Sequence, residues 1–393
     1  NRGLLAPTDI EAARDANAMT FGGAILALAS TDAAHQGAAL ASVSSLLNKG
    51  AAMSEIVGAT VNSKAMSGAQ AAIALMGVDA AHRQAANDAL ATIWSNGGLT
   101  TAMLDSAVGA GLTATQALAV MSKAGAARAD SVSTEIGALF NRGLLPAADL
   151  EAALSMKTLT PSVVVTGLAR TDGAHQAAAL SEIAAIVNKN LAAVSDIHAA
   201  VAAGGLSGVQ AAAVLTQADT AHAAAAKGEI ATLWSQGRLS AANIDAASVA
   251  GTLTGRQAVL ALAQADAAHR NEATREIASL VNANRLSFTD IDNAMGTGIL
   301  SSAFLLSAIP LIDASHQTAL QAELGALFNR NLITIGDLES GLSSGAISKP
   351  QALAMLGAAD AAHLAAAQTE LAALINANRV AYADLETALA AQT

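Results

Sequence analysis

A histidine recurs every 47 residues, and this period restricts the chain to a repeat architecture. His35 and His82 are 82−35=47 residues apart, and the histidines from His175 to His363 keep the same spacing. The interval of 175−82=93 residues holds one further copy, shortened by a residue, with Arg128 at the histidine position. Such a period is typical of helical arrays in which each unit buries its apolar face against its neighbours.

Each repeat has the signals of three helices. Acidic residues such as Asp149 and Glu151 mark the first turn of the first helix, where they favour the helix dipole. The third helix is expected to start at an Asp and to end at Asn-x-Gly or Asn-x-Asn, which stop helices through the left-handed conformation. The second helix opens with a capping box, Ser or Thr followed by Gln, at Ser67 and Gln70, Thr113 and Gln116, Ser207 and Gln210, Thr254 and Gln257, and Ser348 and Gln351.

The apolar residues are small, which suits thin layers of closely spaced helices. The chain is 53% hydrophobic but only 2% aromatic, and Ala, which helices favour most, supplies much of the apolar content. Trp94 and Trp234 occupy the same repeat position as Phe140 and Phe328, so this position is predicted to be buried. The fold class predicted is all-α, a right- or left-handed α-solenoid of about eight 47-residue three-helix repeats.

We expect one continuous α-solenoid over residues 1–393. The opening segment Asn1 to Leu5 matches Asn141 to Leu145, so the chain is expected to be a piece of a longer array or to have its ends covered by like copies. The predicted repeats are approximately 1–47, 48–94, 95–140, 141–187, 188–234, 235–281, 282–328 and 329–375, with a partial copy at 376–393.

In period and helix number these repeats resemble armadillo and HEAT repeats along the whole chain. The resemblance implies an α-solenoid with an extended concave surface. Armadillo proteins line their groove with Asn and Trp, and no regular ladder of that pair is present here. The resemblance therefore implies the fold and not that groove chemistry.

Charge and composition disfavour several classes of partner. A net charge of −11 disfavours nucleic acid and anionic membrane surfaces, which both attract clustered Lys and Arg. The uncharged segment from Met295 to Ile312 contains Pro310 and is interpreted as a buried hairpin, so membrane insertion is not expected. With no cysteine, disulfides and thiolate chemistry are impossible.

The recurring polar motif is Asp-x-x-His at the predicted start of the third helix. We interpret the Asp as an N-cap and the His as its capping-box partner. A hydrogen-bond ladder between repeats and a row of metal sites are the alternatives, and Arg128 in the third copy favours capping over metal. The pairs are Asp32 and His35, Asp79 and His82, Asp172 and His175, Asp219 and His222, Asp266 and His269, Asp313 and His316, and Asp360 and His363.

A glutamate recurs in the third helix seven residues after the histidine position. His and Glu at this spacing lie about 10 Å apart along a helix and cannot share a metal ion. The glutamates are expected to edge the apolar face and to face solvent. The alternative is an acidic stripe that recruits a basic partner or binds cations weakly, formed by Glu135, Glu182, Glu229, Glu276, Glu323 and Glu370.

No catalytic, cofactor or metal site is predicted. Gly-rich phosphate loops are missing, and the serines are explained as caps. His198, the only histidine outside the series, is interpreted as a lone surface residue.

We therefore expect a structural protein and not an enzyme. It would be a segment of a larger rod, fibre or surface scaffold that self-associates, at or beyond the surface of a bacterial cell, with a cytoplasmic location left open. The alternative is a binding solenoid that holds a protein or peptide on its concave face.

Overall fold

The computed structural model describes residues 5–390, with the side chains of residues 387–390 left aside. The predicted match between residues 1–4 and residues 141–144 lies outside these described residues. Every regular element between residues 5 and 390 is a helix, so the all-α prediction is confirmed. Within these residues, no helix is both long enough and apolar enough to cross a membrane.

Three kinds of helix alternate along the chain. The first helices are α1 Pro7–Asp15, α4 Met53–Val57, α7 Thr101–Gly109, α10 Ala147–Ser155, α13 Val194–Ala202, α16 Ala241–Val249, α19 Phe288–Gly296, α22 Ile335–Ser344 and α25 Tyr382–Ala390. The second helices are α2 Phe21–Ala29, α5 Gly68–Met76, α8 Ala114–Met121, α11 Pro161–Ala169, α14 Gly208–Leu215, α17 Gly255–Leu262, α20 Ser302–Ala308 and α23 Lys349–Gly357. The third helices are α3 Gln36–Asn48, α6 Arg83–Ser95, α9 Ala129–Asn141, α12 Gln176–Asn188, α15 Ala223–Ser235, α18 Arg270–Asn282, α21 Gln317–Asn329 and α24 Leu364–Asn376.

Four short elements complete the described part of the chain. A π-helical turn, η1 Gly58–Asn62, continues α4. The others are the 3-10 turns η2 Ala126–Arg128, η3 Ile309–Leu311 and η4 Ala314–His316. The segment that was interpreted as a buried hairpin is thus the end of α19, then α20, then η3, with a turn at Gly298 between the two helices.

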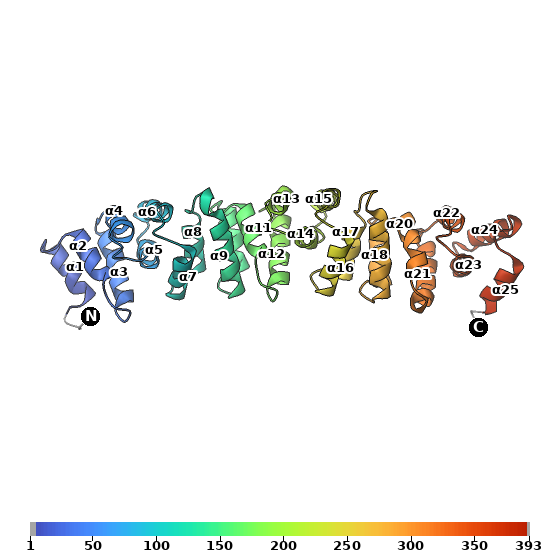
Figure 1. The fold of residues 1–393 in the computed structure, drawn as a ribbon, viewed down its shortest axis with the longest axis horizontal. Coiled ribbons are helices and arrows are strands. Elements are labelled where there is room, and N and C mark those ends of the chain that lie inside the picture. Colours follow the sequence, from blue (N-terminus) through green and yellow to red (C-terminus); the bar gives the residue numbers. More distant parts are fainter. Residues whose placement is uncertain (1–4, 391–393) are drawn as a thin grey trace. The chain divides into compact units, whose positions relative to one another are not determined.

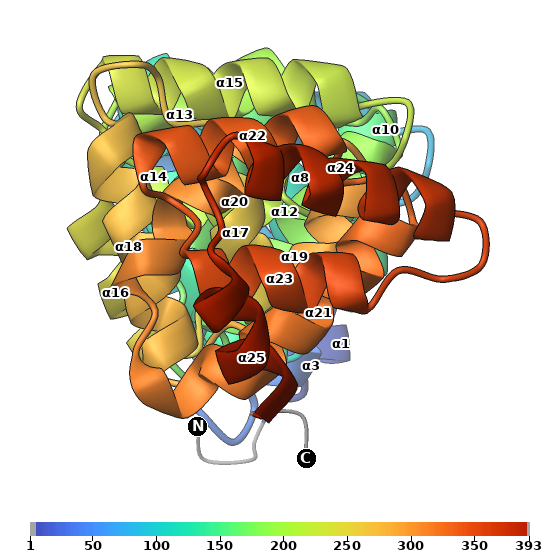
Figure 2. The same ribbon diagram turned by 90° about the vertical axis from the view of Figure 1, so that its right-hand side faces the viewer.

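The helices form two compact units, residues 1–206 and residues 207–393. In the first unit, α1 to α13, helices pack on others one or two places away in the chain, as α5 does on α6 and α7 and α11 does on α9 and α12 (Figure 1). The second unit, α14 to α25, has the same pattern, and Figure 2 shows its last helices with α23 packed on both α24 and α25. The contacts within each unit are therefore those of a helical repeat array; one continuous solenoid with the boundaries given above stays a prediction.

The second helices begin as their sequence predicts. All five capping boxes are present: Ser207 Oγ, for example, accepts from the Gln210 N–H at 3.2 Å, and Gln210 Oε1 accepts from the Ser207 N–H at 2.9 Å. The glycine after the cap permits a close approach. A Cβ on Gly208 would lie 1.9 Å from the Arg238 carbonyl oxygen, so this end of α14 fits against the next repeat only without a side chain.

The third helices supply much of the core and end as predicted. Trp94 and Trp234 are 1% and 0% exposed, which confirms that their shared position is buried. After these helices the backbone turns left-handed, at Asn190 and Asn284 with φ 57° and at Gly143 with φ 67°. Each third α-helix contains 13 residues and starts four residues later than predicted, because the preceding Asp and His belong to a separate turn.

Candidate functional site

The seven predicted Asp and His pairs form one local structure, which we call the Asp-His turn. In each, the His Nδ1 lies 2.6–2.8 Å from the Asp Oδ1, and the third helix starts directly after the His. In six of them the His N–H also donates to this carboxylate. These hydrogen bonds lower the pKa of the aspartates, and the first cause at Asp79, for example, is the bond from His82.

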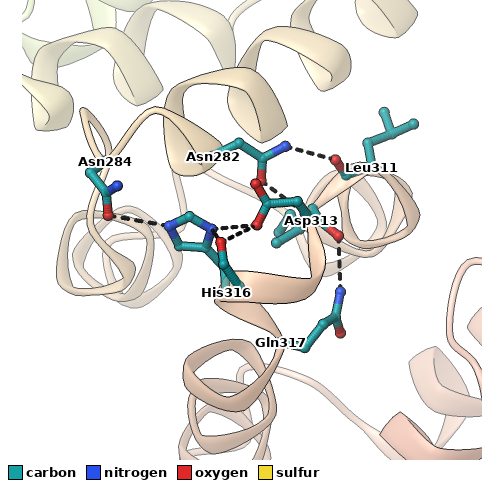
Figure 3. A network of polar contacts seen from close by, with 8 residues as sticks. Asn282, Asn284, Leu311, Asp313, His316 and Gln317 are labelled. Carbon is teal, nitrogen blue, oxygen red and sulfur yellow. Dashed lines mark hydrogen bonds and ion pairs between the residues drawn. The ribbon is translucent and has the colours of Figure 1, made fainter.

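An asparagine from the preceding repeat holds the start of this turn. The Asp313 N–H donates to Asn282 Oδ1 at 2.9 Å, and Asn282 Nδ2 donates to the Leu311 carbonyl at 3.0 Å (Figure 3). Asn329 makes the same two bonds with Asp360 and Ala358. We call this contact the Asn clamp; its members include Asn48, Asn141, Asn282 and Asn329, each of which accepts from the Asp N–H.

The Asn clamp explains why the turn differs from the predicted capping box. In a capping box the third residue would accept from the N–H of the cap, but the N–H of Asp313 is already bonded to Asn282. The His316 ring instead lies between two repeats, with Nδ1 on Asp313 and Nε2 3.2 Å from Asn284 Oδ1 (Figure 3). The turn therefore combines a local cap with a contact to the preceding repeat.

Sequence reasoning missed the Asn clamp because it assigned these asparagines only to helix termination. A signal was present, since Asn48 and Asp79 are 79−48=31 residues apart and the other three pairs keep this spacing. Aromatic residues at the end of the preceding third helix contact two of the histidines. The His269 ring packs 5.6 Å from the Trp234 ring, and the His363 ring packs 5.5 Å from the Phe328 ring.

The glutamates lie in a second recurring cluster, which we call the carboxyl site. Glu135 on α9 is 5% exposed, and its Oε1 has no hydrogen-bond partner among the described residues. An acid on the first helix, Asp105 on α7, and a base beyond the third helix, Arg142, carry the charges that act on it. Arg142 in turn forms an ion pair with Asp105.

Five repeats have a complete carboxyl site, and in four of them the base forms an ion pair with the first-helix acid. The glutamate Oε1 is buried without a hydrogen-bond partner in all five, counted over the described residues. The sets are Glu135, Asp105 and Arg142; Glu182, Glu151 and Lys189; Glu276, Asp245 and Arg285; Glu323, Asp292 and Arg330; and Glu370, Glu339 and Arg379.

The prediction that the glutamates face solvent is wrong. Glu135 and Glu370 are buried, and Glu182, Glu229, Glu276 and Glu323 are half-buried. The cause is the first helix, which packs across the third helix of its own repeat, as α7 does on α9 and α19 does on α21. These glutamates therefore present no open acidic stripe to a basic partner.

Burial raises the pKa of these carboxyls, and the neighbouring acid adds to the effect. The pKa of Glu135, Glu276 and Glu323 rises to about 7, first through desolvation and then through the charge of the first-helix acid, while the nearby arginine opposes the rise. The pKa of Glu182 and Glu370 also rises for these reasons. The sites of Glu135, Glu276 and Glu323 can thus hold one proton between two acids near neutral pH.

The incomplete copies differ in what they lack, and the first repeat keeps the Glu11 and Lys49 ion pair with Ser42 at the glutamate position. In the second repeat the three positions hold Gly58, Ala89 and Asn96, so all three charges are missing at once. His198 lies at the first-helix position, because 198−151=47 and 245−198=47. This spacing is the sequence signal that His198 belongs to the repeat and is not a lone surface histidine.

The carboxyl site can hold a proton, and both recurring sites connect helices. Among residues 5–390, no three His, Asp or Glu side chains lie close enough together to hold a metal ion. No family model matches this chain, and no curated protein or solved structure shows significant similarity to it.

Proposed function

We propose that this chain is a structural repeat protein, a segment of a rod, fibre or surface scaffold that self-associates. The observation that supports this most is how the recurring polar residues are used. The Asn clamp joins one repeat to the next, and the carboxyl site joins the first and third helices of one repeat. The recurring polar residues thus connect helices and repeats. This is expected of a protein whose function depends on its spacing and shape.

The contact pattern supports this proposal. Within each unit a helix packs only on helices close to it in the chain, so each repeat contributes its own stability together with that of its interface with the next repeat. Proteins built in this way can extend by adding repeats without redesigning a core. The finer proposal is an α-solenoid of armadillo or HEAT type, carried by the period and the three helices of each repeat.

The proposal includes self-association, no catalytic role, and a place at or beyond the bacterial cell surface. With 13% charged residues, much of the surface consists of small or neutral polar side chains. Such a surface can pack closely against another copy with little desolvation of charge. Absence of cysteine is compatible with export, and a cytoplasmic scaffold remains the alternative.

A binding solenoid that holds a protein or peptide on its concave face is second. The feature expected to recruit a partner was the acidic stripe of glutamates. Glu135 and Glu370 are 5% and 6% exposed and the other four glutamates are half-buried, which makes this row a poor surface for a basic partner. The other recurring acids, the aspartates of the Asp-His turns, are each hydrogen-bonded to their own histidine.

The decisive experiment measures assembly of the purified chain. We expect the molar mass from light scattering to rise above that of one chain at micromolar concentration, and electron microscopy to show filaments or laterally ordered bundles. Repeating the measurement at high salt separates specific assembly from ionic aggregation, which salt screens.

A chain that stays monomeric at every concentration and salt tested would contradict self-association. If a protein from the same cells then binds this monomer with one-to-one stoichiometry, the binding solenoid becomes the better proposal.

A further inference from the structure

The second unit contains a crevice that combines apolar walls with two cations. It has a volume of about 300 Å³ and lies among the end of α14, the face of α15, the helix α17 and the turn between α19 and α20. Its apolar walls include Leu215, Ile230 and Leu260. Small-molecule sites begin at this size and are lined mainly by such side chains.

Two cations from different repeats line this crevice. Lys227 comes from α15 and Arg256 from α17, and no acidic residue is among the side chains that line the same space. Neither cation has a hydrogen bond or an ion pair within the described residues. In a protein of net charge −11, two cations without an acidic partner at one apolar crevice form a local positive field.

The repeat itself shows that these cations are not needed for the fold. A similar crevice of about 290 Å³ in the first unit is lined by Met121, Val132 and Leu159 and holds no charged side chain. The residue 94 positions before Lys227 is Ser133, whose hydroxyl donates to the Val163 carbonyl at 2.9 Å. The positively charged crevice is therefore a local addition to a feature that occurs without charge elsewhere.

The lining of the crevice favours a ligand with an anionic group at one end and an apolar chain at the other. An anionic group can pair with both cations, and a carboxylate accepts charge-assisted hydrogen bonds well from Arg and Lys. An aliphatic chain in the crevice would bury its apolar surface against these walls. This burial is favourable in proportion to the area removed from water. The Gln264 side-chain amide at the same crevice offers a further hydrogen-bond donor.

We propose that this crevice binds a small amphipathic carboxylate, with its anionic group between Lys227 and Arg256 and its short aliphatic tail against Leu215, Ile230 and Leu260. This binding function goes beyond the structural role proposed above and does not depend on it. The ligand class is a medium-chain organic acid, because the volume leaves no room for a long lipid tail.

The test uses octanoate as the probe and titration calorimetry of the full chain. We expect octanoate to bind with one site per chain and octanol, its neutral analogue, to bind at least about tenfold more weakly, since the charge-assisted bonds are lost. The double variant Lys227→Gln and Arg256→Gln should weaken octanoate binding by at least about tenfold while leaving octanol unchanged.

The matched control is Arg275→Gln, which removes another cation of the same unit from the exposed face of α18. It should bind octanoate as the native chain does. In methyl-labelled protein, the Ile230 resonance should shift on titration, which places the ligand in this crevice. Unchanged circular dichroism verifies that the variants are folded.

Three results would overturn the proposal. These are no octanoate binding at low-millimolar concentration, equal binding of octanoate and octanol, or binding that survives the double variant in a folded chain.

Discussion

The second and third repeats, α4 to α6 and α7 to α9, each lack one of the two recurring polar sites. The second repeat has an Asp-His turn, with Asp79 and His82 2.7 Å apart, but Gly58 and Ala89 stand at its carboxyl site. The third repeat has the complete carboxyl site around Glu135, but Gly125 and Arg128 replace its Asp and His. Both repeats nevertheless form three helices.

This comparison separates what builds a repeat from what is added to it. The helices follow from caps, from helix-stopping Asn and Gly, and from the apolar pattern, which both repeats share. The polar sites are independent of each other, because losing one leaves the other intact. The differences are local: the first helix of the second repeat continues as the π-helical turn η1, Gly58–Asn62, and the third repeat has the 3-10 turn η2, which matches η4 of a repeat with an intact Asp-His turn.

The largest effect expected from the carboxyl sites is on the pH dependence of stability. The pKa of Glu135, Glu276 and Glu323 is about 7 in the fold, against an ordinary value near 4.5. The folded chain therefore binds more protons than the unfolded chain between these values. These glutamates contribute stability that is fully present below their ordinary pKa and is lost as pH rises through about 7. Each glutamate contributes roughly 1–3 kcal/mol to this change.

Thermal unfolding followed by circular dichroism at a series of pH values tests this prediction. The midpoint should be higher at about pH 5 than at about pH 8. Below the ordinary aspartate pKa it should fall again, because the pKa values of aspartates such as Asp79 and Asp172 are lowered in the fold. In Glu135→Gln, the part of the pH dependence that Glu135 contributes should disappear. A midpoint of the native chain that does not change with pH above 5 would contradict the prediction.

The second prediction places a lone acid in the repeat that lacks the site. Ala89 is 5% exposed and has no arginine at the base position, which holds Asn96. Ala89→Glu should lower the free energy of unfolding by about 2–4 kcal/mol at neutral pH, because an unpaired carboxylate is desolvated. Chemical denaturation measures the loss.

Ala89→Gln is the matched control, since it adds nearly the same volume without charge. The difference between the two variants should shrink on acidification, as the new carboxyl becomes protonated. If both variants lose the same stability at neutral pH, crowding and not charge is the cause.

Local sequence signals predicted the helices well because caps and stops act over three or four residues. The capping box at Ser207 and Gln210 and the stop at Asn284 need no knowledge of distant residues. The burial of Glu135 could not be predicted in this way. It depends on α7 packing across α9, which is a contact between residues about thirty positions apart that carries no local pattern.

The Asp-His turn shows the same limit. Its sequence matched a capping box, and the pair does meet at the predicted position. The Asp313 N–H donates to Asn282 of the preceding repeat. It is therefore not available to the His316 side chain as a capping box would require. Only the spacing of 31 residues between such Asn and Asp positions could have indicated this contact from sequence.

The third prediction tests the Asn clamp by comparing two adjacent junctions. Asn141 accepts from the Asp172 N–H at 3.1 Å, whereas Ser95, at the corresponding end of α6, bonds only within its own helix, to Ala91. Asn141→Ala should lower stability by about 1 kcal/mol through the lost hydrogen bond. Ser95→Ala should have almost no effect, and an equal loss in both denaturation curves would show that the clamp adds nothing.

The smallest effect concerns the base of the carboxyl site in the third repeat. Arg142 and Asp105 form an ion pair whose side chains are 42% and 37% exposed, so Arg142→Gln should change stability by less than about 1 kcal/mol. Its effect on Glu135 should be clearer, because the Arg142 charge opposes the rise in the pKa of Glu135. Carboxyl-carbon resonances followed by NMR over a pH series should show Glu135 titrating at higher pH in the variant.

Lys123→Gln removes an unrelated cation of the same unit and should leave that titration unchanged. A Glu135 titration identical in Arg142→Gln and the native chain would mean that the base serves Asp105 alone, and the third repeat would then differ from the second by a buried glutamate and not by a three-charge site.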